Sequence, residues 1–163
     1  MGKAQLTIEF FFVLTLFTIV LYQLSSFQNI MILSEATGVI NQQKTLANDL
    51  TQLANNVCNL DVDTTIPLPC IITSKGSKNY LMQNGGPNKE KVLVIAVIGE
   101  LGEVTETKEA FCAFQIKTID GVIKTAIELA PEDCNQNNYA GKTICMKKSL
   151  EPNTVDVTEN ACP

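Results

Sequence analysis

Apolar side chains dominate the first part of the chain, and their spacing changes near residue 35. Residues 10–34 contain no charged side chain, and the large apolar residues are densest within residues 10–24. As an α-helix, these 25 residues would be about 37 Å long, more than the ~30 Å hydrocarbon core of a bilayer. Thr15 and Thr18 can return hydrogen bonds to a helix backbone. The pattern therefore predicts an apolar helix of membrane-spanning length.

The helical pattern continues beyond this apolar run in an amphipathic form. Apolar residues recur mostly at spacings of three and four, namely at Ala36, Val39, Ile40, Ala47, Leu50, Leu53, Ala54 and Val57. No proline occurs before Pro67, and Gly38 is expected to be a soft point within the helix rather than its end. We therefore predict one helix from about Gln5 to about Val57, roughly 80 Å long.

The clearest later pattern is two alternating stretches, residues 111–119 and 122–129, separated by Asp120-Gly121. This arrangement predicts a β-hairpin with a two-residue type I′ turn, in which Ile119 pairs with Val122. One face of the hairpin would be apolar and would hold Cys112, Phe114, Ile116, Ile123, Ile127 and Leu129. We expect this face to cover the helix stripe formed by Leu46, Leu50, Leu53 and Val57.

Other segments complete an α+β prediction. Residues 92–98 form a continuous apolar run, which is typical of a central strand buried on both faces. Residues 142–146 predict another short strand. Glu100, Glu103, Glu106 and Glu109 are expected in a solvent-exposed connection, with an acid-lined binding surface as the alternative. The overall expectation is one long N-terminal helix packed against a small antiparallel sheet.

Charge and composition exclude several classes of function. The chain has 12 Lys, 17 acidic residues, a net charge of −5, no Arg, no His and no Trp. The acidic balance and the lack of Arg argue against nucleic-acid binding. Without His, neither a His-dependent triad nor a His-ligated metal centre can form. We find no phosphate loop or nucleophile elbow, so we expect no catalysis and no cofactor.

One group of oxygen-bearing side chains has a spacing that occurs in metal sites. Asn59, Asp61 and Asp63 have alternating calcium-ligand spacing, but the loop lacks the Gly and the bidentate Glu of an EF-hand. We therefore predict no metal.

The six cysteines, Cys58, Cys70, Cys112, Cys134, Cys145 and Cys162, all follow the predicted helix. Their even number and the absence of CxxC favour three disulfides in an extracytoplasmic domain. Six cysteines allow 15 pairings. A preference for short loops predicts Cys58–Cys70 and Cys134–Cys145, which leaves Cys112–Cys162.

Glu9 is the one charged residue between Lys3 and Glu35. A carboxylate at the edge of a membrane-length segment is costly unless it is paired, and it usually marks a functional site. A secretory signal would end in a small-residue cleavage site, and the apolar run has no convincing A-x-A site after it. A plain uncleaved anchor with its N-terminus inside explains the hydrophobicity, but it does not explain Glu9.

The segment Lys3-Ala4-Gln5-Leu6-Thr7-Ile8-Glu9-Phe10 resembles the class III signal peptide of archaeal type IV pilin-like proteins. That pattern is Gln, any residue, Ser or Thr, any residue, Glu and Phe, followed by a long apolar helix. The resemblance covers about 30 residues, with Ala4 where Gly is more usual and Thr7 in place of Ser. It implies cleavage between Ala4 and Gln5 by a prepilin peptidase.

The resemblance also implies a pilin-like domain order. Residues 1–4 would be the cleaved signal peptide, and residues 5–34 the hydrophobic half of the helix, first transmembrane and later in the filament core. Residues 35–57 would be the amphipathic half and residues 58–163 a disulfide-bonded, β-rich globular part.

The implied function is that of a structural subunit of an extracellular archaeal type IV pilus-like filament, with adhesion as its downstream role. Gln5, Glu9 and Phe10 would set the assembly register, with Glu9 pairing to the α-amino group of a neighbouring subunit. The structural alternative is that Glu9 benefits only from the helix dipole.

The implied partners are copies of the chain, the prepilin peptidase, the membrane assembly machinery and, before assembly, the cytoplasmic membrane. The precursor would cross this membrane once with its N-terminus inside, and no nucleic acid would be bound. The alternatives are an archaellin-like or minor or tip pilin, and a non-polymerising, single-pass membrane-anchored extracellular binding module.

Overall fold

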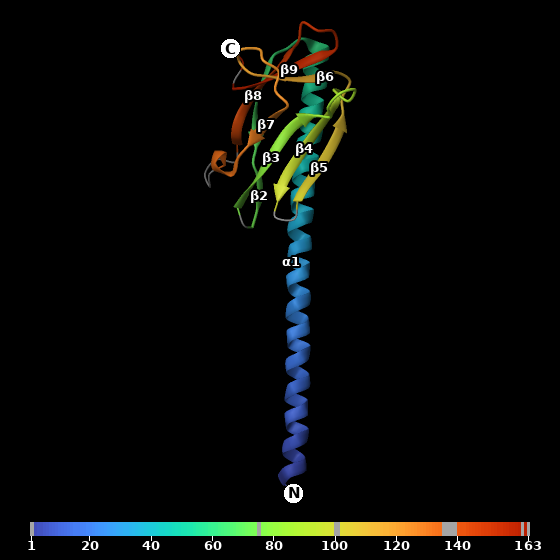
Figure 1. Cartoon of the computed structure of the whole chain (residues 1–163), viewed down its shortest axis with the longest axis vertical. Coiled ribbons are helices and arrows are strands. Elements are labelled where there is room, and N and C mark those ends of the chain that lie inside the picture. The colour runs from blue at the N-terminus through green and yellow to red at the C-terminus, as the bar shows by residue number, and fades with distance from the viewer. Residues whose placement is uncertain (1, 75, 100–101, 135–139, 161, 163) are drawn as a thin grey trace. The chain divides into compact units, whose positions relative to one another are not determined.

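The computed structural model describes residues 2–74, 76–99, 102–134, 140–160 and 162, and it omits the side chains of residues 2–9 and 26–33 among others. The first element is helix α1, Gly2–Leu60 (Figure 1). The chain forms two compact units, Met1–Thr37 and Gly38–Pro163, and each is described by itself. We call the second unit the head, and it includes residues 38–60 of α1.

The head combines the end of α1 with two β-sheets and a short 3₁₀ helix, which makes it an α+β domain (Figure 1). The first sheet has the order β1-β8-β9-β6, and the second has the order β2-β3-β4-β5 with β7 also paired to β3. All strand pairs are antiparallel except β6 with β9. The elements are β1 Thr64–Pro69, β2 Ile71–Thr73, β3 Gly76–Asn84, β4 Val92–Gly99, β5 Gly102–Glu109, β6 Ala113–Lys117, β7 Ala126–Leu129, η1 Pro131–Asp133, β8 Ala140–Lys148 and β9 Thr154–Glu159.

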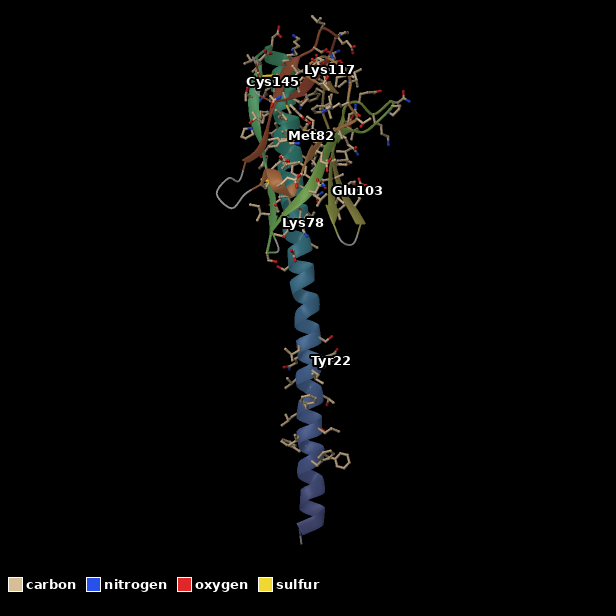
Figure 2. The ribbon with its side chains drawn as sticks, turned by 60° about the vertical axis from the view of Figure 1, so that its left-hand side comes forward. Tyr22, Lys78, Met82, Glu103, Lys117 and Cys145 are labelled. Carbon is tan, nitrogen blue, oxygen red and sulfur yellow. A yellow bond between two sulfur atoms is a disulfide. The ribbon has the colours of Figure 1, made fainter. Side chains whose placement is uncertain are left out.

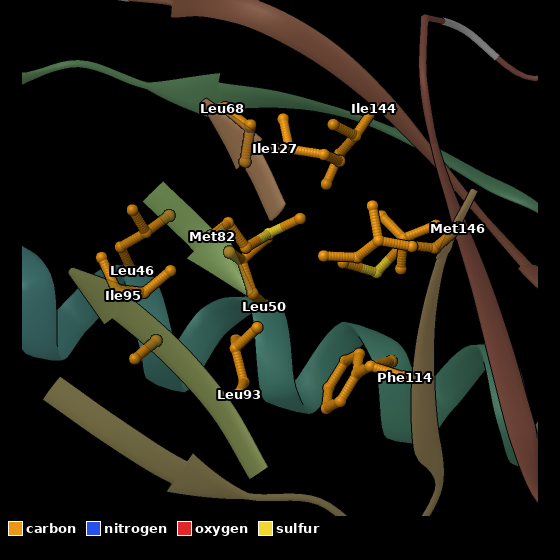
Figure 3. Close-up of a cluster of buried hydrophobic side chains, with 14 of the residues drawn as sticks. Leu46, Leu50, Leu68, Met82, Leu93, Ile95, Phe114, Ile127, Ile144 and Met146 are labelled. Carbon is orange, nitrogen blue, oxygen red and sulfur yellow. The ribbon is translucent and has the colours of Figure 1, made fainter. Parts of the chain in front are cut away.

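The core of the head lies between α1 and the apolar faces of both sheets (Figure 3). The predicted helix stripe is buried at Leu46, Leu50 and Val57, and Leu53 is partly buried against the same cluster. The first sheet contributes Phe114, Ile144 and Met146, and the second contributes Met82, Leu93 and Ile95. The amphipathic spacing of residues 43–57 is therefore explained by burial of one face of the helix within the head.

The predicted central strand is confirmed by β4, which pairs with β3 on one side and with β5 on the other. Alternate residues Leu93, Ile95 and Val97 join the main core, while Val94 and Ala96 are also buried. Burial on both faces explains why the sequence here is continuously apolar rather than alternating. The short strand predicted at residues 142–146 is also confirmed, as the centre of β8.

The predicted hairpin is wrong. The chain does reverse direction at Asp120-Gly121, but a type I′ turn needs a positive φ at both residues and Asp120 has none, so the predicted turn does not form. The Thr118 N–H donates to the Val122 carbonyl at 2.8 Å, and Gly121 has a φ of 81°. A single bridge joins Lys117 and Ile123, one residue out of the expected register, and the two strands then separate. β6 pairs with β9 in the first sheet, and β7 pairs with β3 in the second.

The predicted apolar face of that hairpin is nevertheless largely buried. Cys112, Phe114, Ile116, Ile127 and Leu129 all lie in the core. Ile123 is the exception, since it lies in the turn region and is 64% exposed. The alternation of apolar and polar residues thus identified the buried face of each strand. The two strands belong to different sheets, and both faces contribute to the same core.

The predicted disulfide pairing is also wrong. All six cysteines are bonded, as Cys58–Cys112, Cys70–Cys134 and Cys145–Cys162. The short-loop rule fails because extended chain intervenes: the six residues of β1 cover about 20 Å between Cys58 and Cys70. The observed bonds join the last turn of α1 to the segment before β6, the β1–β2 junction to the end of η1, and β8 to the C-terminus. Three disulfides are typical of a domain in an oxidising environment outside the cytoplasm.

The acidic stretch that was expected to be an irregular connection is strand β5. Glu103, Glu106 and Glu109 lie on this strand, and Glu100 lies outside the described residues. β5 is at the edge of its sheet, where both faces can carry polar side chains. The sequence did not predict a strand here, because an edge strand of this kind lacks the apolar face that gives an alternating pattern.

Two consecutive glutamines attach α1 to the second sheet. The Gln42 side chain both accepts a hydrogen bond from the Ile72 N–H at 2.9 Å and donates one to the Ile72 carbonyl at 2.8 Å. The buried Gln43 side chain donates to the carbonyls of Ile95 and Val104 at 3.2 and 2.9 Å. These polar side chains therefore position α1 against β2, β4 and β5.

Tyr80 is a buried polar residue that stabilises the β1–β2 junction. Its hydroxyl donates to the Pro69 carbonyl at 2.9 Å, next to Cys70. Burial disfavours the phenolate and raises the pKa of Tyr80 well above its usual range.

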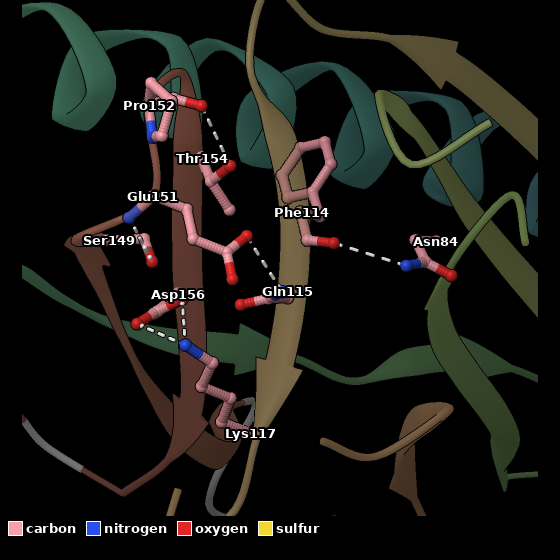
Figure 4. Close-up of polar contacts among 9 residues, drawn as sticks. All are labelled: Asn84, Phe114, Gln115, Lys117, Ser149, Glu151, Pro152, Thr154 and Asp156. Carbon is pink, nitrogen blue, oxygen red and sulfur yellow. Dashed lines mark hydrogen bonds and ion pairs between the residues drawn. The ribbon is translucent and has the colours of Figure 1, made fainter. Parts of the chain in front are cut away.

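A partly buried ion pair joins β6 to β9 (Figure 4). Lys117 Nζ lies 2.8 Å from Asp156 Oδ1 and donates a hydrogen bond to Oδ2 at 2.9 Å. Asp156 is only 7% exposed, so its carboxylate depends on the lysine for compensation. Lys117 and Asp156 are directly adjacent to the buried residues Ile116 and Val157.

We expect Lys117→Met to destabilise the head by about 2 kcal/mol, because it leaves a nearly buried carboxylate without its partner. The measurement is the urea unfolding midpoint of the full chain in detergent. Lys124→Met is the matched control, since the Lys124–Glu159 pair is longer, at 3.6 Å, and more exposed. Its cost should stay below about 0.5 kcal/mol. Equal losses from both substitutions would show that burial of Asp156 does not matter.

Candidate assembly segment

The first compact unit carries an unusually apolar exposed surface. We call residues 10–25 the apolar segment. Its large hydrophobic side chains are between 47 and 76% exposed, and Figure 2 shows side chains on both sides of the helix around Tyr22. They are Phe10, Phe11, Phe12, Val13, Leu14, Leu16, Phe17, Ile19, Val20, Leu21, Tyr22 and Leu24. Exposed apolar patches of this extent mark interaction sites with proteins or membranes.

The hydroxyl groups of the two threonines in the apolar segment are satisfied within the helix itself. Thr15 Oγ1 donates to the Phe11 carbonyl at 2.8 Å. Thr18 Oγ1 lies 2.8 Å from the Thr15 carbonyl and 3.1 Å from the Leu14 carbonyl. These threonines can therefore enter an apolar environment without losing a hydrogen-bond partner. The segment has no charged side chain, so packing against other apolar surfaces is the chemistry it offers.

The predicted membrane span, residues 5–34, lies only partly within the described side chains. Within that described part of the chain, no helix has a stretch that is both long and apolar enough to cross a membrane.

The predicted cleavage and register residues are only partly visible. Phe10 is 63% exposed at the start of the apolar segment. Ala4, Gln5 and Glu9 fall within α1, but their side chains lie outside the described residues. The roles predicted for these residues therefore stay predictions.

Asp61, the central residue of the calcium-like spacing, lies close to a lysine side chain. Asp61 has a φ of 56°, and its carboxylate lies 3.6 Å from Lys148 Nζ. Among the residues that the structure describes, no group of three or more acidic or sulfur-bearing side chains could hold a metal ion.

Described residues of the head line at least two open hollows. The larger, of about 600 Å³, lies between the β3–β4 loop and strands β4 and β5, and it is lined in part by Lys89, Lys91 and Glu109. The smaller, of about 320 Å³, lies between α1 and the β1–β2 junction, and it is lined in part by Asp49, Pro69 and Ile71. Neither hollow could be predicted from the sequence, because each joins side chains that are distant in the chain.

A charge-poor face of α1 was also missed. Although the chain carries 12 Lys and 17 acidic residues, Lys44 and Asp49 are the charged residues within residues 36–60. The spacing of the apolar residues does not reveal this face, whereas the polar positions between them are mostly Asn, Gln and Thr. That scarcity of charge is the signal that could have identified this face.

Comparison of the chain with models of known protein families, with curated proteins and with solved structures gives no match.

Proposed function

We propose that this chain is a structural subunit of an extracellular, archaeal type IV pilus-like filament, assembled through its N-terminal helix. The observation that carries the proposal is the apolar segment, whose large side chains are exposed and are therefore suited to pack against other molecules. The motif Gln5-Leu6-Thr7-Ile8-Glu9-Phe10 precedes it directly and supplies the predicted processing site.

In this proposal the N-terminal helix occupies two locations, one after the other. The precursor crosses the cytoplasmic membrane once, and after cleavage the same helix packs among copies of itself in the filament. The disulfide-bonded head supports a destination outside the cytoplasm. Adhesion is the downstream role that we propose for the filament.

A second candidate is a membrane-anchored extracellular binding module that does not polymerise. The observation that favours it is the 600 Å³ hollow beside β4 and β5, since binding sites are commonly concave. Such a protein would keep its N-terminus as a permanent anchor.

The state of the N-terminus distinguishes these two functions. We expect mass spectrometry of the protein purified from its own cells to show a mature chain beginning at Gln5. An intact Met1 or Gly2 would contradict the filament proposal and favour the anchored module. The same preparation should contain filaments in electron micrographs.

A further inference from the structure

The outward face of α1 in the head is polar but uncharged. Seven residues form this face, and each is exposed or half-buried: Asn41, Thr45, Asn48, Gln52, Asn55, Asn56 and Asn59. A solvent-facing helix surface ordinarily carries Lys and Glu, whereas the centres of protein interfaces are depleted of charge. Asn and Gln side chains both donate and accept hydrogen bonds, so this face can pair with an identical face on another copy.

Lys44 and Asp49 lie on opposite flanks of this uncharged face. They are five residues apart, which places them about 140° apart around the helix axis and about 7.5 Å apart along it. Both side chains are exposed, and neither makes an ion pair within the described residues. Opposite charges on opposite flanks are complementary when one copy lies beside the next in the same orientation.

The two flanks face different parts of the head. On the Asp49 side, Gln42 bonds to Ile72 of β2, and Asp49 itself lines the 320 Å³ hollow with Pro69 and Ile71. On the Lys44 side, Asn55 Oδ1 accepts a hydrogen bond from the Phe111 N–H before β6. A contact between these flanks therefore joins two different surfaces.

The Asp49 hollow has the chemistry to receive a lysine side chain. Leu46, Pro69 and Ile71 supply apolar surface, while Asp49, Asn41 and Thr45 supply polar groups at its edge. A lysine side chain combines an apolar stem with a charged end, and it commonly packs the stem on apolar surface while the ammonium reaches a polar partner. The hollow is open to solvent, so a side chain from another molecule can enter it.

We propose that Lys44 of one copy enters the Asp49 hollow of a second copy, with the uncharged helix faces packed between them. This inference rests on the proposed filament function, because it names the contact through which the copies associate. Because Lys44 and Asp49 are about 7.5 Å apart along the helix, seating Lys44 beside Asp49 of the next copy shifts the two copies along the helix axis. The contact is then not reciprocal, so it is heterologous, and repetition of it builds an open filament rather than a closed dimer. Cleavage before Gln5 would remove Lys3 and leave 11 Lys and 17 acidic residues, a net charge of −6 on each copy, so an uncharged face is also where copies repel least.

Charge reversal tests the contact in the full-length chain produced in its own cells. We expect Lys44→Glu and Asp49→Lys each to lower the yield of sheared filaments about tenfold, because each places like charges together at every contact. The double variant Lys44→Glu/Asp49→Lys should restore the yield to near the wild-type level. Filaments are counted by electron microscopy and quantified by sedimentation.

Matched controls separate this contact from a general effect of charge. Lys89→Glu and Asp63→Lys make the same changes in net charge at exposed positions elsewhere on the head, and both should assemble normally. Thermal unfolding should be the same for all variants, which shows that the head is folded. Normal assembly of both single variants, or no recovery in the double variant, would overturn the inference while wild-type filaments still support the proposed function. An absence of wild-type filaments would overturn both.

Discussion

Glu9→Ala is expected to lower filament yield by about a hundredfold or more while the chain still accumulates in the membrane. In the proposed assembly, the Glu9 carboxylate pairs with the α-amino group of Gln5 on a neighbouring subunit. Loss of one partner from a buried ion pair costs about 3–5 kcal/mol, since the other charge is left uncompensated. Immunoblots of the membrane fraction and electron microscopy of the sheared fraction measure the two quantities.

Two further variants make the Glu9 result specific. Glu9→Gln keeps the size of the side chain and removes its charge, so it should also fail to assemble if the ion pair matters. Glu103→Ala removes an exposed acid from edge strand β5 and should leave assembly unchanged. Normal filaments from Glu9→Ala would refute the register role and leave the helix-dipole explanation, worth only about 0.3–1 kcal/mol.

Removal of the Cys58–Cys112 bond by double substitution to alanine should destabilise the head by about 4 kcal/mol. The bond closes a long loop, with a sequence separation of 54, and so restricts the unfolded chain strongly. It also holds the last turn of α1 against the segment that leads into β6. Chemical unfolding of the oxidised full chain in detergent measures the loss.

The Cys145–Cys162 bond provides the matched comparison, because it closes a loop with a separation of only 17. The same chain-entropy argument gives about 3 kcal/mol for its removal. We therefore expect the Cys58→Ala/Cys112→Ala variant to be the less stable of the two. The reverse order would show that native contacts near the C-terminus, rather than loop closure, determine the effect.

The sequence predicted the structure best where the burial of one helix or one strand alone determines the pattern of apolar residues. The spacing of Leu46, Leu50 and Val57 follows from one buried helix face, and the continuous apolar run at residues 92–98 follows from burial of both faces of β4. In each case the period of apolar residues reports the local environment directly. These features could be predicted because no knowledge of a distant partner was needed.

The sequence did not show which strands pair with one another or which cysteines bond. The reversal of the chain at Asp120-Gly121 was predicted, but the strands on either side of it join β9 and β3, which are far away in the chain. The disulfides follow the same arrangement, since the positions of the strands decide which sulfur atoms meet. The Asp49 hollow was missed for this reason too, because α1 and the β1–β2 junction form it together.

The edge strands of the sheets are poorly suited to pair with strands of another copy, which matters for a protein at high local concentration. The Gln42 side chain hydrogen-bonds to both the N–H and the carbonyl of Ile72 in β2. In β6, the Phe114 N–H donates to the Glu90 carbonyl, and the Phe114 carbonyl accepts a hydrogen bond from the Asn84 side chain. β1 contains Pro67 and Pro69, which have no N–H to offer. β5 carries charged side chains along its length. Strand exchange at these four edges is thereby disfavoured, so neighbouring heads can be concentrated without joining their sheets there.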